Sequence, residues 1–495
     1  MIQESRFHPD LGNGTYRNPV ISQDIPDPTV LRDGDTYYYC GSTGYYYPAL
    51  AIYMSKDLVN WAFVCHPCPN YTGNVYAPEL TKYNGKYYLY FPADGTNFVT
   101  VSDRIDSGWC DPVDLKIGHI DPGHCVVNGK RYLFVSGNWA APLSDDGMSA
   151  AGPLEKICGA QALPDDWDIE GPYTESPKLV QKGEWYYLIY ADGGTAGPAT
   201  AHAVMCARAK DPIQGPWEFS PYNPMVHTWS RREKWHCKGH GSMVDDVCGN
   251  WWILYHAYEA GYPNQGRKVL LEPVIFTEDG WPVLAGSGSD AVSSEAVLPK
   301  PAGVDIGIRD SLSDRFENGR SPLWQMRGSC DFSRIHAGGG CLTIGAFPAD
   351  NPGRCHPITV CPADHAYAVQ VTLEKPDEGC EAGVILMYDE SHYAALGWKE
   401  NRITIYRLGS PLYGQSVPQD AKTLTIRMRN DRHYVAFSVG VNGGELHKIN
   451  YVQNVEAMSN IAYGGFSSLR AGLFACGKGE AHFGPFLYEA LEDSE

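Results

Sequence analysis

NGKYYLYFPAD, residues 84–94, is the clearest copy of a pattern that recurs along this chain of 495 residues. A polar turn is followed by a short aromatic strand, and four further stretches share this form: DGDTYYYCGST around Tyr37, NGKRYLFVSGN around Tyr132, KGEWYYLIYADGG around Tyr186 and CGNWWILYHAYE around Trp251. The copies lie about 50 residues apart, a spacing typical of β-propeller blades of four short strands. Five copies predict five blades; the alternative is an irregular β-sandwich whose aromatic strands recur by chance.

The composition favours an all-β chain. It holds 53 Gly and 35 Pro, which mark turns, and 32 Tyr and 13 Trp, which favour strands. Past about residue 305 the repeat stops, and strands of alternating polarity such as YAVQVTLEK and AGVILMYD follow. We therefore predict a five-bladed β-propeller over residues 1–300 and a β-sandwich of the jelly-roll type over residues 305–495.

Charge and cysteine usage limit the partners and the compartment. The chain has 39 Lys+Arg against 58 Asp+Glu, a net charge of −19, which argues against a nucleic-acid partner. No stretch approaches the ~18 apolar residues of a membrane span, and the N-terminus lacks the features of a signal peptide. The 15 Cys are scattered, and the Cys65–Cys68 pair has no second CxxC to complete a zinc site. We expect a cytoplasmic protein without a membrane partner; its oligomeric state stays open.

Ionisable residues stand just upstream of four of the five aromatic strands, where the innermost strand of each blade is expected. A charge on such a strand is unfavourable unless it is paired, bound to a ligand or facing a wet cavity. Inner strands of a propeller converge on its axis, so these side chains should meet in one funnel. The five positions are Asp27, Pro78, Asp121, Glu175 and His240.

Two carboxylates across a funnel suit glycoside hydrolysis, in which one protonates the leaving oxygen and the other activates water or attacks. A third carboxylate nearby raises the pKa of the acid by repulsion between like charges. A non-catalytic carbohydrate-binding propeller is the rival interpretation. It is disfavoured because a lectin has little reason to keep three uncompensated carboxylates on one axis.

These blocks together resemble glycoside hydrolase family 43, in particular its β-xylosidase/α-L-arabinofuranosidase branch. The resemblance runs from about residue 17 to 285, and the later domain is similar to the concanavalin-like domain appended to many family 43 xylosidases. We expect a structural role for this domain; sugar binding, support of the active-site rim and assembly are the alternatives. The blocks that carry it include NPVISQDIPDPTVLRDGDTYYY, SKDLVNW, YAPELTKYNGKYYLYFPA, IDPGHCVVNGKRYLF, ESPKLVQKGEWYYLIYADGGTAGP, KGHGSMV and GRKVLLEPV.

The resemblance implies an inverting mechanism with three acidic residues. Asp27 of the DPTVL segment matches the general base, Asp121 of the IDP segment matches the pKa modulator, and Glu175 matches the general acid. The family segment is usually written EGP, whereas this chain reads Glu-Ser-Pro. Glu170 in IEGPY is therefore an alternative acid, but it stands five residues too early to share the position of Asp121 within the repeat.

Three further residues are expected to contact substrate on the strength of the resemblance. His240 matches a histidine that faces a calcium ion on the propeller axis in many relatives; the alternative is an uncharged histidine hydrogen-bonded in the core. Arg267 matches an arginine that contacts substrate and the carboxylates; its alternative is a surface salt bridge. Tyr76 stands where relatives commonly have Trp, and we expect it to stack on a sugar ring.

The function implied is an exo-acting hydrolase that releases terminal β-D-xylose and/or α-L-arabinofuranose from xylo- or arabino-oligosaccharides with inversion. An endo-arabinanase, or another specificity of the same family, is the alternative among enzymes. Inversion requires room for water between base and sugar, so we expect the carboxyl groups of Asp27 and Glu175 to lie roughly 6.5–9.5 Å apart.

Overall fold

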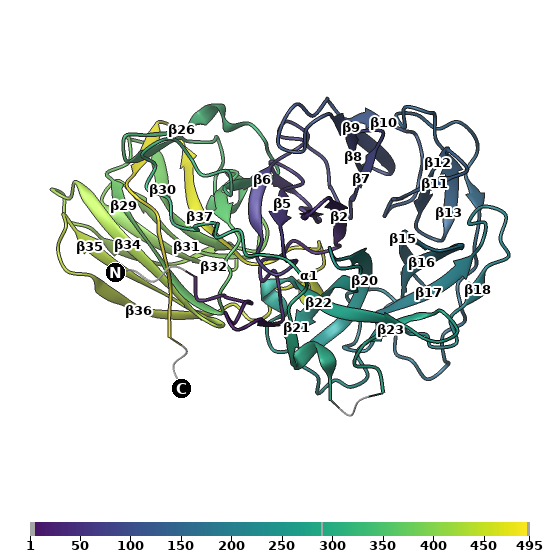
Figure 1. Ribbon diagram of the computed structural model, residues 1–495. Helices are drawn as coiled ribbons and strands as arrows, with labels where there is room; N and C mark the ends of the chain where they lie inside the picture. The colour runs from purple at the N-terminus through teal and green to yellow at the C-terminus, as the bar shows by residue number, and fades with distance from the viewer. Residues whose placement is uncertain (1–4, 289–290, 493–495) are drawn as a thin grey trace.

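The computed structural model describes residues 5–288 and 291–492, so the outermost residues of the two expected domains, 1–4 and 493–495, and residues 289–290 lie outside the description. Two β-rich parts lie side by side (Figure 1). One consists of five antiparallel sheets around a common centre, and the other of two large sheets packed as a sandwich. The predicted fold class, a five-bladed β-propeller followed by a β-sandwich, is confirmed.

Each blade is an antiparallel sheet whose strands follow one another outward from the axis. Blade 1 comprises β2 (Thr29–Asp33), β3 (Thr36–Cys40), β5 (Ile52–Ser55) and β6 (Ala62–Cys65). Blade 2 comprises β7 (Glu79–Tyr83), β8 (Lys86–Ala93), β9 (Thr96–Ser102) and β10 (Val113–Asp114). Blade 3 comprises β11 (Gly123–Val127), β12 (Lys130–Val135), β13 (Trp139–Pro142) and β14 (Glu155–Lys156). Blade 4 comprises β15 (Thr174–Lys182), β16 (Trp185–Asp192), β17 (Ala203–Ala209), β18 (Glu218–Phe219) and β19 (Val226–His227). Blade 5 comprises β20 (Trp235–Asp245), β21 (Trp251–Glu259), β22 (Arg267–Phe276) and β23 (Pro282–Leu284).

The repeated NGK turn makes the hairpin between the first two strands of a blade. Asn84 and Gly85 have φ of 48° and 80°, and Asn128 and Gly129 have φ of 50° and 78°. Positive φ at both central residues defines the type I′ turn, whose twist matches that of the flanking strands. The local turn chemistry therefore sets the register of the innermost strand of blades 2 and 3 against its neighbour.

The sandwich is built from two sheets of eight strands. The first runs β33 (Ser410–Ser416), β32 (Arg402–Arg407), β31 (Tyr393–Lys399), β30 (Cys380–Met387), β37 (Arg470–Gly477), β28 (Ile358–Val360), β25 (Gln325–Arg327) and β4 (Tyr46–Tyr47). The second runs β26 (Ile335–Gly338), β27 (Cys341–Gly345), β38 (Glu480–Phe483), β29 (Ala366–Glu374), β34 (Thr423–Asp431), β35 (Tyr434–Val441) and β36 (His447–Asn454), with β39 (Leu487–Ala490) on β29. A small sheet pairs β1 (Thr15–Arg17) with β24 (Val297–Pro299).

Helix is scarce in the described residues: α1 (Asn460–Tyr463) and the 3-10 turns η1 (Pro263–Gln265), η2 (Ser293–Glu295), η3 (Phe332–Arg334) and η4 (Pro352–Arg354). None of these has the length and hydropathy required to cross a bilayer.

Apolar packing differs between the two parts. The sandwich has one continuous core between its sheets, which includes Trp324, Trp398 and Phe437. The propeller instead has five smaller clusters, each between two neighbouring blades and each built from the side chains of the aromatic strands. Burial of apolar area between blades therefore holds the ring closed, and it leaves the axis to the polar residues.

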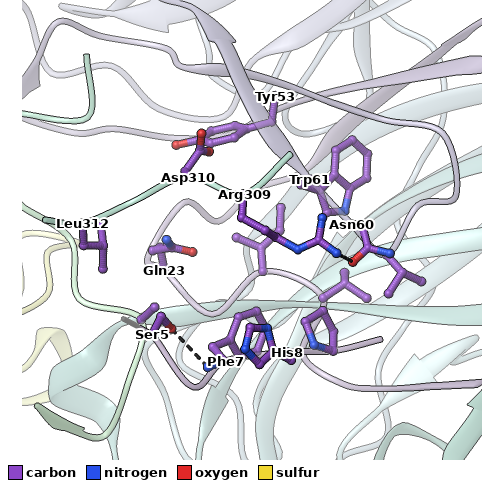
Figure 2. Close-up of a pocket in the computed structure, with 15 residues that line it drawn as sticks. Ser5, Phe7, His8, Gln23, Tyr53, Asn60, Trp61, Arg309, Asp310 and Leu312 are labelled. Carbon is purple, nitrogen blue, oxygen red and sulfur yellow. Dashed lines mark hydrogen bonds between the residues drawn. The ribbon is translucent and has the colours of Figure 1, made fainter. Parts of the chain in front are cut away.

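Blade 1 is physically part of the sandwich as well. The chain leaves this blade between β3 and β5 to form β4, in which Tyr46 and Tyr47 pair with Arg327 and Met326 of β25. A cavity of about 170 Å³ lies at the same junction, between the N-terminal segment, blade 1 and residues 309–312. Its lining residues are drawn in Figure 2. Arg309 reaches across it to donate to Asn60 Oδ1 at 2.8 Å. None of the predicted catalytic residues lines this cavity.

Candidate active site

Four blades carry a left-handed residue in or just before their innermost strand. Asp27, Asp121, Ser176 and His240 have φ of 61°, 57°, 58° and 56°. Non-glycine residues rarely adopt this conformation, which costs about 1–3 kcal/mol and is concentrated at functional sites. In blades 4 and 5 the strands β15 and β20 also shift register next to these residues. The strain is thus a repeated feature of the chain where it reaches the axis.

Asp27 is buried, and its carboxylate contacts a positively charged arginine together with serine and histidine side chains. Its Oδ1 accepts from Arg267 Nη1 at 2.7 Å and lies 2.9 Å from His256 Nδ1, while its Oδ2 accepts from Ser42. Burial by itself raises the pKa of a carboxyl group, but here the guanidinium of Arg267 and the neighbouring histidines hold the pKa of Asp27 well below its usual range. Asp27 is therefore ionised at neutral pH, as a general base must be.

Asp121 has the opposite electrostatic environment. It is 3% exposed, and its Oδ2 accepts from the backbone N–H of Ser176 at 3.1 Å. Burial, followed by the charges of Glu175 and Asp27, raises its pKa well above the usual value. Glu175 and Asp27 therefore lie close enough to Asp121 for their charges to raise its pKa.

Glu175 is on the bulged part of β15, opposite Ala191 of β16. Its Oε1 lies 3.1 Å from Nε2 of the buried His202, and its side chain is 19% exposed, so it reaches solvent more than the other two acids do. Glu170, the alternative acid, lies in the loop before β15 and accepts from the backbone N–H of Ala196 at 2.7 Å. The charge of Glu175 thus acts on Asp121, whereas Glu170 is hydrogen-bonded to the loop between β16 and β17.

An aromatic rim lies beside the acids, and part of it comes from the sandwich. The ring of Tyr76 packs edge-on against Phe466 at 6.0 Å, and the guanidinium of Arg267 lies 5.4 Å from the same ring. A small pocket between blade 1 and the sandwich is lined by Tyr76, Arg267 and Phe466, among other residues. Arg267 is buried and bound to Asp27, which differs from the surface salt bridge named as its alternative.

Sequence reasoning did not identify three residues of this site: His202, His256 and Phe466. His256 lies within the buried strand WWILYHAYE, so an ionisable residue in an apolar strand is the signal that points to it. His202 directly precedes β17 outside the repeated motif, and Phe466 lies in a different domain. No local pattern distinguishes these last two.

The donors around His240 fit a calcium ion poorly. One carboxylate oxygen of Asp27 and ring nitrogens of His240 and His256 lie within 4.8 Å of one another. Asp27 already accepts from Arg267, and His256 is engaged at both nitrogens, with Nε2 3.0 Å from Thr195 Oγ1. Nε2 of His240 is buried and has no hydrogen-bond partner among the residues that the structure describes. One ring nitrogen is therefore left to bind a cation, whereas Ca²⁺ prefers six to eight oxygen ligands. The calcium ion stays a prediction that this donor set does not favour.

Comparisons with known proteins bear on both parts of the chain. Residues 16–282 match the model of glycosyl hydrolases family 43, and residues 363–489 match that of the beta xylosidase C-terminal concanavalin A-like domain. A non-reducing end alpha-L-arabinofuranosidase of Bacteroides ovatus is 25% identical over 516 residues, which cover 96% of this chain and 94% of that protein. A beta-xylosidase of Bacillus subtilis is 26% identical over 524 residues, covering 91% and 94%.

Solved structures agree along nearly the whole chain. The GH43 protein BlXynB from Bacillus licheniformis superposes with a TM-score of 0.83 at 25% identity, covering 96% of this chain and 100% of that one. The GH43B protein from a xyloglucan locus of Bacteroides ovatus has a TM-score of 0.85 at 22% identity, covers 96% of this chain and 100% of that one, and shows the same fold. Propeller and sandwich therefore occur together in these proteins as they do here.

Proposed function

The chain belongs to family 43 of the glycosyl hydrolases and is a glycoside hydrolase, and from this premise we propose that it removes single terminal pentoses, β-D-xylose and/or α-L-arabinofuranose, from short oligosaccharides with inversion at C1. Its relatives include proteins named as an arabinofuranosidase and as a xylosidase, which supports this substrate class. Asp27 is proposed as general base, Glu175 as general acid and Asp121 as the residue that tunes the acid.

The observation that carries the proposal is the contrast between the surroundings of two carboxyl groups at the axis, Asp27 and Asp121. The pKa of Asp27 is held low by Arg267, whereas the pKa of Asp121 is raised by burial and by Glu175. The negative charge of Glu175 therefore disfavours ionisation of Asp121. Acetal hydrolysis requires an ionised base together with carboxyl groups whose surroundings differ in this way.

In the proposed reaction, Glu175 gives its proton to the glycosidic oxygen while the bond between that oxygen and C1 breaks. The carboxylate of Asp27 takes a proton from a water molecule, whose oxygen bonds to C1 from the opposite face and inverts its configuration. Afterwards Asp27 carries the proton and Glu175 is ionised. Proton exchange with solvent returns both groups to their starting states.

Exo action is supported by the position of Phe466. Its ring packs against Tyr76 and lies under the guanidinium of Arg267, which itself binds the proposed base. An aromatic side chain at this place bounds the sugar site on the side of the sandwich. A bounded site accepts a chain end more readily than the middle of a polymer.

The test compares 4-nitrophenyl β-D-xylopyranoside, 4-nitrophenyl α-L-arabinofuranoside and the matching unsubstituted oligosaccharides. We expect Asp27→Ala to lose activity on all of them. Glu175→Ala should lose about 10²–10⁴-fold in kcat on the oligosaccharides but much less on the 4-nitrophenyl glycosides, because 4-nitrophenolate leaves without a proton. Proton NMR of the first sugar released should show the inverted anomer.

Glu170→Ala is the matched control, since this carboxylate lies nearby but outside β15, and it should retain most activity on both substrate types. If Glu170→Ala instead shows the loss restricted to oligosaccharides, the acid has been assigned to the wrong residue. Internal cleavage of a polymer with no release of monosaccharide would replace the exo proposal by an endo-acting one. Sugar binding without hydrolysis would overturn catalysis by this site.

A further inference from the structure

A buried lysine ammonium lies at the axis of the propeller, beside the candidate site. Lys178 is on β15, and its side chain is only 4% exposed. Its Nζ donates three hydrogen bonds, to the carbonyl oxygens of Pro78 at 2.7 Å and Pro122 at 2.9 Å and to Glu79 Oε2 at 2.8 Å. The two carbonyls directly precede the inner strands of blades 2 and 3, so one ammonium ties three blades together.

Glu79 extends this contact to blade 1. Its Oε2 also accepts from Thr29 Oγ1 of blade 1 at 3.1 Å, and its Oε1 accepts from the backbone N–H of His124 in blade 3 at 3.3 Å. Lys178 and Glu79 therefore link four of the five blades. All three ammonium protons have oxygen partners, as a buried charge requires.

The oxygen atoms around this ammonium are those that a hard divalent cation would select. Two backbone carbonyls and one carboxylate oxygen converge on Nζ, and carbonyl and carboxylate oxygens are the ligands of Ca²⁺ in proteins. The charge of Lys178 also acts on the candidate site. Burial is the largest cause of the lowered pKa of His240, and the positive charge of Lys178 lowers this pKa further. A divalent ion beside His240 would thus be repelled by a cation that the chain already carries.

We propose that the ammonium of Lys178 is the resident cation of the propeller axis, occupying the oxygen site that a divalent metal ion would otherwise take, so that this hydrolase folds and works without a bound metal. The inference does not depend on which pentose is released. It concerns metal content and stability, which can be measured even if the proposed function proves wrong.

The first test uses the wild-type protein. After purification without chelator, elemental analysis should find far less than one equivalent of calcium per chain. Excess EDTA should leave Tm unchanged and should change kcat/KM by less than about twofold. Titration with CaCl₂ in a calorimeter should show no saturable binding. One tightly held calcium per chain, or loss of activity in EDTA, would overturn the proposal.

The second test removes the ammonium and keeps its oxygen partners. Lys178→Ala leaves the half-buried Glu79 carboxylate without its counter-charge, so the Tm of this variant in EDTA should fall by about 10 °C. Millimolar CaCl₂ should restore much of this loss and bind with about one equivalent, whereas wild type should not respond. Lys182→Ala, at the exposed end of the same strand, is the matched control and should behave as wild type.

If Lys178→Ala does not fold even with CaCl₂, the double variant Lys178→Met/Glu79→Gln decides the question, because it removes both charges and leaves no unpaired carboxylate. We expect it to fold and not to bind Ca²⁺. A folded Lys178→Ala that ignores Ca²⁺, or a double variant that binds it, would show that these oxygens are not a cation site.

Discussion

Ionisation of a buried carboxyl group beside two others is unfavourable, and Asp121 is in this position. Its pKa in the folded protein is raised above the value of about 3.9 expected in the unfolded chain. As the pH rises past the pKa of Asp121 in the unfolded chain, the unfolded chain therefore releases this proton before the folded protein does. The resulting loss in the free energy of unfolding grows until the pH passes the pKa of Asp121 in the folded protein. It is absent at pH values well below the pKa in the unfolded chain.

Asp121→Asn should for this reason stabilise the protein and inactivate it. An Asn side chain can still accept from the Ser176 N–H but carries no charge to repel Glu175. We expect Tm to rise by at least about 2 °C near pH 7 and to match wild type near pH 4, with kcat lowered about 10²-fold or more. Thermal unfolding at both pH values measures the first effect.

Asp145→Asn removes an exposed carboxylate of blade 3 and is the control, for which we expect no change at either pH. A lower Tm for Asp121→Asn near pH 7 would contradict the raised pKa on which the argument rests.

The loop after α1 is the element of the sandwich that reaches the candidate site. Phe466 N–H donates to Asn460 Oδ1 at 2.7 Å, and Asn460 Nδ2 donates to Tyr258 OH at 3.0 Å in blade 5. Further along, the N–H of Leu469 donates to the carbonyl of Asn264 at 2.9 Å. Both ends of the loop are thus anchored on the propeller, which holds the exposed ring of Phe466 beside Tyr76. The second domain thereby places an aromatic side chain beside the candidate site in addition to packing against the propeller.

Phe466→Ala should impair catalysis while leaving the fold intact. Removal of the ring takes apolar area away from one side of the sugar site, so kcat/KM on an oligosaccharide should fall about 10–100-fold with little change in Tm. Ile461→Ala truncates a side chain of α1 that is 51% exposed and should leave both quantities unchanged. Equal kcat/KM for the two variants would remove Phe466 from the substrate site.

Across the whole molecule, the two domains share a sheet and a buried arginine. Arg470 Nη1 donates to Gln325 Oε1 at 2.6 Å, and its guanidinium lies 4.0 Å from the ring of Tyr46, the propeller residue that extends the sandwich. Gln325 Nε2 in turn donates to the carbonyl of Pro48 at 2.9 Å. This chain of contacts crosses the junction, so we expect propeller and sandwich to unfold as one unit.

Arg470→Met should separate their unfolding. It keeps a side chain of similar length but removes the hydrogen bond to Gln325 and the charge above Tyr46. Differential scanning calorimetry should show one transition for wild type and two for this variant. Arg407→Met, which changes an exposed arginine of β32, should unfold like wild type. Two transitions already in wild type would show that the junction does not couple the domains.

The number of blades and the chain segments that bring Asp27, Asp121 and Glu175 to the axis could be predicted from the amino-acid sequence. Both depend on local chemistry: paired residues of positive φ make the hairpins, and aromatic strands recur at the length of one blade. The alternation of the later strands likewise predicted the sandwich, because period-2 patterning requires one buried face.

The balance of charge among the carboxyl groups, and what bounds the site, became visible only in three dimensions. Arg267 meets Asp27 across 240 positions of sequence, and Lys178 reaches carbonyls 56 and 100 positions away. Phe466 comes from another domain altogether. No periodicity connects such residues, since their contacts are set by ring closure and domain docking. The charge each group feels, and hence its pKa, exists only once those distant side chains have come together.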